Sequence, residues 1–290
     1  MRKIALSVLW LAAALVPVRG QVNGVTVQLQ LDQDQYLPEE DLQLKVRITN
    51  RSGQPVSFGQ DDHWISFDVI GERDRLISKL GEMPVKGPFT LLSGQETTRP
   101  LNPTPYFDFR RPGRYRIGAL ISIPQWNQQI ACRPAAFTVS EGVPLPNLGN
   151  LQIGVPPPAG LTNVPPEVRR YSLIKVAYLD ELKLYFRLTD KYGRTLRVFP
   201  LAPMLSLSDP EAQIDRANNL HVLLQTGAKT FTYSVLDPAG NLIARQFHQY
   251  TRTRPKLSCD GGGQVFVAGG RRLFTLSDIP APVPEAAKSR

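Results

Sequence analysis

The sequence contains few of the residues that covalent cross-links and catalysis use most. Its 290 residues include two cysteines, three histidines and three tryptophans. Small proteins stabilised by disulfides are dense in cysteine, so the two cysteines, Cys132 and Cys259, exclude a disulfide scaffold. Whether these two residues form one bridge between the two halves of the chain stays open at this stage.

The sequence also lacks the short motifs of common enzymes. It has no His-x-x-x-His pair for zinc and no Gly-x-Ser-x-Gly for a hydrolase nucleophile. Asp61, Asp62 and His63 put two carboxylates beside an imidazole, but adjacent strand residues point to opposite faces, and we interpret the segment as a solvated loop. The glycine-rich segment 260–264 leads into an apolar strand pattern, whereas phosphate-binding loops open a helix. We therefore predict no catalytic residue, no cofactor and no metal ligand, and a protein that is not an enzyme.

No long block of like charge occurs, although the formal net charge is +9. Such a mild basic excess is ordinary for solubility, and we expect no nucleic-acid partner. One basic cluster stands out within seven residues and lies close to aromatic residues. Arginine forks can grip sulfated or phosphorylated glycans, while strand alternation would simply place some of these side chains on a solvent face. The candidate binding residues are Arg110, Arg111, Arg114 and Arg116.

The N-terminus has the pattern of a cleaved secretory signal peptide. Two basic residues precede an apolar run from Ile4 to Val18, and small residues lead up to Gln21. A run of this length would span only about 22 Å as a helix, which is short of a ~30 Å bilayer core. No later stretch is long and apolar enough to cross a membrane. We expect residues 1–20 to be removed and the mature protein to be secreted or periplasmic, without a transmembrane segment.

Proline marks the boundaries between predicted domains. Seven prolines fall between Gly142 and Pro166, and proline favours an extended, unpaired backbone. We predict a proline-rich linker at 142–166 between a domain at 21–141 and a domain at 167–277. A second proline-rich stretch predicts a disordered tail at 278–290.

The first domain alternates apolar and polar residues with period two. The pattern covers Val25 to Leu31 and Leu42 to Ile48, and it returns around Ile65–Val69, Tyr115–Ile123 and Phe137–Val139. Six or seven short strands separated by turn residues, with no amphipathic helix, predict an antiparallel β-sandwich.

These residues also carry a resemblance. Asp34 and Tyr36-x-Pro38-x-Glu40, followed by the alternation through Asn50, resemble the first hairpin of bacterial immunoglobulin-like domains. The segments "RITNRSGQPVSF" and "HWISFDVIGERDRLI" resemble the Ig-like fold of intracellular proteinase inhibitor-like domains. The resemblance implies an Ig-like fold and raises proteinase inhibition, with the loop from Gly81 to Gly94 as the candidate inhibitory segment.

The second domain contains a repeat. "YFRLTDKYGRTL" from Tyr185 parallels "YSVLDPAGNLI" from Tyr233, and "DRANNLHVLLQTG" from Asp215 parallels "DGGGQVFVAGG" from Asp260. The offsets of about 45 residues resemble β-propeller blades. Two units are too few for a closed propeller, so we expect two blade-like meanders that pack face to face, on the first domain or on a second chain. The Asp-x-x-Gly segments are typical of hairpin turns and also raise calcium binding.

The whole order of segments resembles a family of uncharacterised secreted bacterial proteins, which implies architecture and location but no activity. We expect an all-β protein that acts as a non-catalytic binding or assembly module of the cell envelope, with a protein or an anionic glycan as partner. Proteinase inhibition and an unrecognised glycan-active site, whose paired carboxylates can be distant in sequence, remain alternatives. The oligomeric state is not determined by the sequence.

Overall fold

The computed structural model describes residues 21–22, 24–61, 63–85, 87–157, 165–179 and 181–279. Strands dominate these residues, which confirms the predicted all-β class. In the described residues, the helical segments are short 3₁₀ turns, and no helix is long and apolar enough to cross a membrane. The predicted signal peptide at 1–20, and residues 280–290 of the predicted tail, lie outside the described residues. The 3₁₀ turns are η1 (Glu72–Asp74), η2 (Thr104–Tyr106) and η3 (Pro124–Trp126).

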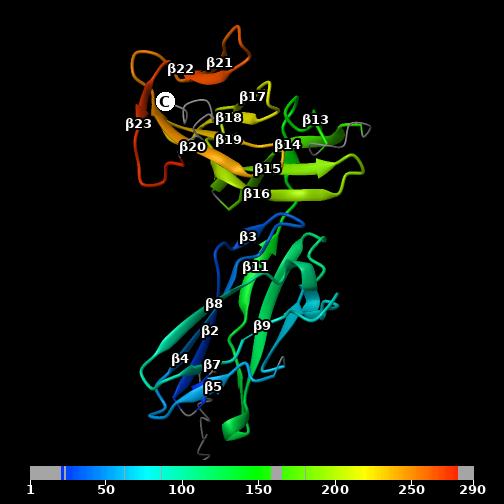
Figure 1. Cartoon of the computed structure of the whole chain (residues 1–290), viewed down its shortest axis with the longest axis vertical. Coiled ribbons are helices and arrows are strands. Elements are labelled where there is room, and N and C mark those ends of the chain that lie inside the picture. The colour runs from blue at the N-terminus through cyan, green and yellow to red at the C-terminus, as the bar shows by residue number, and fades with distance from the viewer. Residues whose placement is uncertain are drawn as a thin grey trace, which may run out of the picture.

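The N-terminal part is a sandwich of two sheets (Figure 1). Sheet 1 is antiparallel, in the order β1 (Gln21–Val22), β2 (Val25–Leu31), β4 (Leu44–Asn50) and β8 (Glu96–Leu101). Sheet 2 is built around β9 (Gly113–Ile123), which pairs with β6 (Ile65–Ile70), β10 (Gln128–Ala131) and β11 (Ala135–Val139). β3 (Gln35–Tyr36) joins β11 in parallel. A separate hairpin pairs β5 (Val56–Phe58) with β7 (Phe89–Leu91).

Period-two alternation explains why these strands form the sandwich. In β4, Leu44, Val46 and Ile48 are buried while Lys45 and Arg47 are exposed. Each strand therefore has one apolar face, and the two sheets bury these faces against each other in a single core. The predicted strands at 25–31, 65–69, 115–123 and 137–139 are all present.

The segment at 142–166 differs from the predicted linker, because part of it is folded into the second domain. β12 (Val143–Pro144) and β13 (Leu151–Val155) both pair with β14 (Glu167–Tyr178). Leu145 and Ile153 are buried in the core of that domain, so apolar side chains anchor the segment despite its prolines. An edge strand tolerates proline because the missing N–H faces away from the ladder. Residues 158–164 lie outside the described residues.

The second part consists of two meanders and a hairpin. Sheet 3 contains β12, β13, β14, β15 (Glu181–Asp190) and β16 (Thr195–Pro203). Sheet 4 has the order β17 (Glu211–Ile214), β18 (Leu220–Gln225), β19 (Thr230–Leu236), β20 (Leu242–Gln249) and β23 (Arg271–Leu273). β21 (Lys256–Cys259) and β22 (Val265–Ala268) form a two-stranded sheet of their own, and the segment "DGGGQ" at 260–264 is the turn between them.

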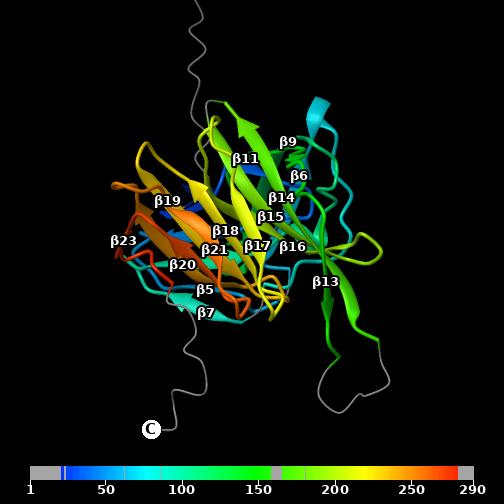
Figure 2. The same ribbon diagram turned by 90° about the horizontal axis from the view of Figure 1, so that it is seen from above.

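Sheet 3 lies next to the sandwich, sheet 4 lies beyond it and the hairpin β21–β22 lies outermost, while β23 returns to sheet 4 (Figures 1 and 2). Sheets 3 and 4 share one core. They do not coincide with the two predicted repeat units, because the first unit contributes β15 and β16 to sheet 3 and β18 to sheet 4, and the second contributes β19 and β20 to sheet 4 and β22 to the hairpin. The hairpin β21–β22 covers the other face of sheet 4 through Leu257 and Val265. β18 is thus buried on both faces, which explains why its sequence, LHVLLQ, is apolar without clear alternation.

One type of turn recurs four times in this part. It joins β15 to β16, β17 to β18, β19 to β20, and β21 to β22, and it begins at Asp190, Asp215, Asp237 and Asp260. Each Asp carboxylate accepts a backbone N–H from the residue four positions later, at 2.7–2.9 Å. These carboxylates cap their own turns, as hairpin chemistry predicts. Among the described residues, no group of three metal-ligating side chains is placed to hold a cation.

The two parts of the chain pack directly on each other. Leu37, which follows β3, is buried with Ile174, Val176, Tyr185 and Val198 of sheet 3. The hydroxyl group of Tyr185 donates to the carbonyl oxygen of Gln35 at 3.5 Å, and Nε2 of Gln35 donates to the carbonyl oxygen of Ala177 at 3.4 Å. Leu37 belongs to the Tyr36-x-Pro38-x-Glu40 motif, so this motif forms the domain junction.

Candidate functional site

The predicted arginine cluster lies at and before the start of β9, on the solvent side of sheet 2. Arg114 and Arg116 are exposed, whereas Tyr115 and Ile117 are buried in the sandwich core. Successive strand residues point to opposite faces, so both guanidinium groups share the outer face. Strand alternation alone explains why these two side chains are exposed.

The other two predicted arginines precede the strand. Arg110 donates two hydrogen bonds to Asp108, from Nε and Nη2, each at 2.8 Å. This contact lowers the pKa of Asp108 to about 2, and the charge of Arg110 is offset by its neighbour. The carbonyl oxygen of Arg111 accepts a hydrogen bond of 2.6 Å from the hydroxyl group of Tyr115. Arg111 is exposed and lies beside Arg114, whereas Arg110 faces neither of the grooves described below.

A charged turn that the sequence reasoning missed brings further arginines to this surface. The turn η1 follows β6 and contains Arg73, and Arg75 comes directly after it. Arg73 and Asp74 both have left-handed backbone conformations, with φ of 56°, which non-glycine residues rarely adopt. Asp74 forms an ion pair with Arg116 across the gap between the turn and β9. The charged run "GERDR" after the predicted strand at 65–69 was the available signal.

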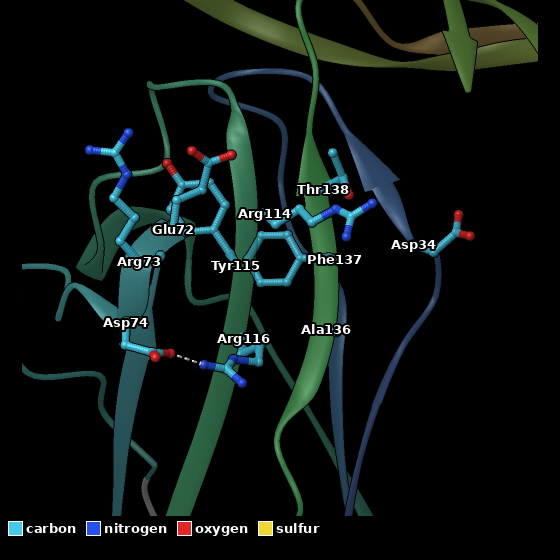
Figure 3. A pocket seen from close by; sticks show the side chains of 11 residues that line it. Asp34, Glu72, Arg73, Asp74, Arg114, Tyr115, Arg116, Ala136, Phe137 and Thr138 are labelled. Atoms are coloured by element: carbon cyan, nitrogen blue, oxygen red, sulfur yellow. Dashed lines mark hydrogen bonds and ion pairs between the residues drawn. The ribbon is translucent and has the colours of Figure 1, made fainter. Parts of the chain in front are cut away.

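The turn and the outer face of sheet 2 enclose an open groove of about 780 Å³ (Figure 3). In Figure 3, Arg116 extends toward Asp74 on one side of β9, while Arg114 extends toward Thr138 on β11. Asp34 stands on the far wall, before β3. A second groove of about 320 Å³ shares Arg73 and Arg114 and adds Arg75 and Arg111. We call the two together the arginine groove.

The arginine groove carries more positive than negative charge. Five arginines (Arg73, Arg75, Arg111, Arg114 and Arg116) face three carboxylates (Asp34, Glu72 and Asp74). Within the described part of the chain, only Arg116 of these five has its guanidinium group in an ion pair. Guanidinium groups that are exposed and unpaired can donate in parallel to sulfate, phosphate or carboxylate oxygens. The groove can therefore bind an anion electrostatically.

Another groove, separate from the arginine groove, lies at the domain junction and has a volume of about 970 Å³. Its charged residues are Asp32, Asp34, Glu181 and Lys183, and Lys183 pairs with Glu181 at 3.3 Å. Glycosidase chemistry needs a carboxylic acid with a raised pKa next to an ionised carboxylate. Burial raises the pKa of Glu40 to about 7, but both of its oxygens are occupied, by the N–H of Leu37 and by Nε2 of Gln33. Glu40 does not line this groove.

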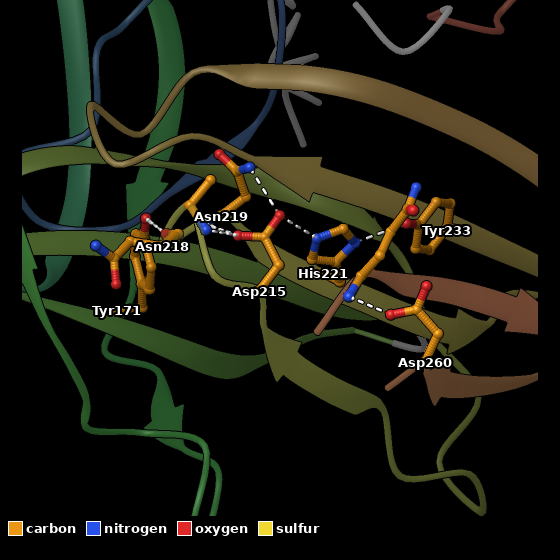
Figure 4. A network of polar contacts seen from close by, with 9 residues as sticks. Tyr171, Asp215, Asn218, Asn219, His221, Tyr233 and Asp260 are labelled. Atoms are coloured by element: carbon orange, nitrogen blue, oxygen red, sulfur yellow. Dashed lines mark hydrogen bonds and ion pairs between the residues drawn. The ribbon is translucent and has the colours of Figure 1, made fainter. Parts of the chain in front are cut away.

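A buried polar network ties sheet 4 to its neighbours (Figure 4). Nδ1 of His221 lies 2.6 Å from the hydroxyl oxygen of Tyr233, and Nε2 lies 3.1 Å from Oδ2 of Asp215. Burial alone would raise the pKa of Asp215, but hydrogen bonds from His221 and Asn219 outweigh it and lower that pKa. His221 is 6% exposed, so the arrangement has the elements of an acid–base triad without access for a substrate.

Two further predicted segments have structural roles. The N–H of His63 donates to Oδ1 of Asp61 at 2.8 Å in an exposed loop, as a solvated turn would, while Asp62 lies outside the described residues. In the candidate inhibitory loop from Gly81 to Gly94, Val85 is buried and accepts a hydrogen bond from Nε1 of Trp64 at 3.0 Å. Part of the same loop forms β7. The two cysteines are free thiols, Cys132 buried and Cys259 exposed.

No protein-family profile matches the sequence, and no curated protein matches it. Among solved structures, the sporulation control protein Spo0M from Bacillus subtilis is similar over 58% of this chain and 80% of its own length. The sequence identity is 15% and the TM-score is 0.32. A similarity of this size carries no inference about this chain.

Proposed function

We propose that this protein is a non-catalytic binding module of the cell envelope whose arginine groove holds an anionic ligand. The observation that carries the proposal is the set of exposed guanidinium groups of Arg73, Arg111 and Arg114 around one open groove. A glycan with sulfate, phosphate or uronate groups has the chemistry that such groups recognise.

The fold supports binding by pre-organisation. Arg114 lies at the start of β9, where it pairs with Thr138 of β11, and the hydrogen bond from Tyr115 to Arg111 fixes the segment that precedes it. The ion pair between Asp74 and Arg116 holds the η1 turn over the groove. Ordering these groups before the ligand arrives reduces the entropy that binding would otherwise lose.

The test is isothermal titration calorimetry with sulfated dextran and with polygalacturonate, at low ionic strength. In the double variant Arg73→Gln/Arg114→Gln, we expect at least a tenfold loss of affinity, because each charge-assisted hydrogen bond contributes about 1.5–3 kcal/mol. The control is Arg47→Gln, an exposed arginine on sheet 1. Unchanged affinity in the groove variant would contradict the proposal.

We further propose that residues 1–20 direct export and are then removed. The basic start, the apolar run and the small residues before Gln21 support this location. Expression of the full chain in a bacterium with two membranes, followed by fractionation and N-terminal sequencing, tests it. The expected product begins at Gln21 in the periplasm or medium, and an intact N-terminus in the cytoplasm would contradict the proposal.

A further inference from the structure

A second basic surface lies in the other domain, where three segments meet at one end of sheet 4. These are the start of β19, the connection from β20 to β21, and the turn between β22 and β23. Twelve residues of these segments, 229, 249–256 and 269–271, include five basic residues and no acidic residue. All five basic residues are exposed. We call this surface the basic corner, and it consists of Lys229, Arg252, Arg254, Lys256 and Arg271.

Hydrogen bonds tie the three segments together. The N–H of Tyr250 donates to the carbonyl oxygen of Lys229 at 2.8 Å. Nη2 of Arg271 donates to Oε1 of Gln249 at 2.9 Å, and the N–H of Gly270 donates to Oγ1 of Thr253 at 3.1 Å. The basic residues are therefore neighbours in space, although they are separated by up to 42 positions in the sequence.

The backbone beneath the basic corner is closely packed. Gly269 and Gly270 have positive φ values of 74° and 63°. A Cβ atom on Gly269 would lie 2.8 Å from the carbonyl oxygen of Arg254, and one on Gly270 would lie 2.6 Å from Cγ of Pro255. Only glycine permits this approach. Pro255 is itself buried between Arg254 and Lys256, so the two charged side chains project from a fixed stretch of chain.

The charges of the basic corner are not neutralised by ion pairs. Arg254 donates from Nη2 to Oγ of Ser208 at 3.2 Å, and its guanidinium carbon lies 5.3 Å from the ring centre of Phe231. Both contacts orient the side chain and leave its charge uncompensated. Within the described residues, no salt bridge involves any of the five basic residues. The nearby carboxylate of Glu211 accepts the backbone N–H of Leu257 at 2.8 Å.

We propose that the basic corner binds a linear polyanionic glycan, independently of the arginine groove. Five exposed cations on one surface suit a polymer with regularly spaced sulfate or phosphate groups better than a single small anion. Thr251 and Thr253 alternate with the arginines, are exposed, and supply hydroxyl groups that can hydrogen-bond to sugar hydroxyls. Single-stranded nucleic acid relies on several aromatic side chains for base stacking, and Tyr250 is the one aromatic residue in these segments.

The experiment measures the affinity of the residue 21–290 protein for a sulfated dextran of defined length over a series of salt concentrations. Releasing counterions from a polyanion makes the logarithm of affinity fall linearly with the logarithm of salt concentration. Arg252→Gln/Lys256→Gln removes two contacts, so we expect this slope to decrease by about 1.5 and the affinity at low salt to fall at least tenfold. The control Lys45→Gln/Arg47→Gln removes the same charge from exposed positions of sheet 1 and should change neither.

Two further arms distinguish this proposal from the arginine groove and from nucleic-acid binding. Arg73→Gln/Arg114→Gln should leave the contribution of the basic corner intact, so combining the two pairs of substitutions should lower the affinity further. Equal losses from the basic-corner and sheet 1 variants would overturn the proposal, because net charge alone would then explain binding. Tighter binding of single-stranded DNA than of dextran sulfate of equal charge would also overturn it.

Discussion

The hydroxyl group of Tyr185 in sheet 3 reaches the carbonyl oxygen of Gln35 at the edge of the sandwich, 150 residues earlier in the chain. Tyr185 is fully buried, and Leu37 packs beside it with 1% of its surface exposed. The contact makes the two domains neighbours with a shared apolar core, and the two proposed binding surfaces are therefore held on one packed body.

Leu37→Ala should loosen this junction. Removing a buried leucine side chain costs about 2–5 kcal/mol when the site cannot collapse. We expect the unfolding transition to shift to lower temperature and to separate into two steps, because each domain keeps its own main core. Differential scanning calorimetry measures this. Leu80→Ala, at a position 62% exposed, is the control and should have little effect. A single unshifted transition in Leu37→Ala would show that the junction adds no stability.

Glu40 should make stability depend on pH. Burial raises its pKa from an ordinary 4.5 to about 7, despite the hydrogen bonds from Leu37 and Gln33. The folded protein then holds this proton more tightly than the unfolded chain, so the free energy of unfolding should fall as pH rises from about 4.5 to 7, by up to about 3 kcal/mol. His248 opposes this below pH 6.5, because burial lowers its pKa and its unfolded form binds the proton better.

The variant Glu40→Gln isolates the first effect. It keeps the shape of the side chain and an oxygen that can accept the N–H of Leu37, but it cannot titrate. Urea unfolding at pH 5 and pH 8 should show that the wild-type protein loses more stability than the variant across this interval. The same pH dependence in both proteins would mean that Glu40 does not hold its proton in the folded state.

Asp215→Ala should destabilise more than the same change at the equivalent turn. Asp215 caps its turn and also contacts Nε2 of the buried His221, whereas Asp237 caps its turn through Asn241 alone. Leaving a buried polar atom without a partner costs about 1–3 kcal/mol. The free energies of unfolding of Asp215→Ala and Asp237→Ala, obtained from urea titrations, should therefore differ by at least about 1 kcal/mol. Equal free energies of unfolding would show that the histidine finds another partner.

The two cysteines should react at very different rates. Cys259 is exposed, while Cys132 is buried and its pKa is raised to about 12 by burial. The thiolate is the reactive form, so a disulfide reagent at pH 8 should titrate one thiol in the native protein and two in denaturant. Cys259→Ser should remove the native reaction. No reactive thiol in denaturant would indicate a bridge between these residues instead.

Much of the sandwich could be predicted from the sequence because each of its strands has one solvent-exposed face and one buried face. The alternation of Val25 to Leu31 marks β2 with the same bounds, and the same rule placed Arg114 and Arg116 on the outer face. Prediction failed where burial did not follow the local pattern. The prolines at 142–166 indicated a linker, but Leu145 and Ile153 are drawn into the core of sheet 3 and its neighbours.

Only part of the arginine groove could be predicted from the sequence. Arg111, Arg114 and Arg116 lie close together in the chain, so the sequence alone indicates their cluster. Arg73 and Arg75 are about 40 residues earlier, and they reach the groove because β6 pairs with β9 and the η1 turn folds back beside it. The basic corner was missed for the same reason, since its three segments meet only after sheet 4 has formed.

The sequence by itself determined the all-β class, the strands with one apolar face, and the four Asp turns, because each depends on the chemistry of neighbouring residues. The tertiary structure alone decided how the layers stack, that Leu37 joins the two domains, and which arginines share a surface. These relationships depend on pairing between strands that are distant in the chain. A local sequence pattern does not determine which two apolar faces pack against each other.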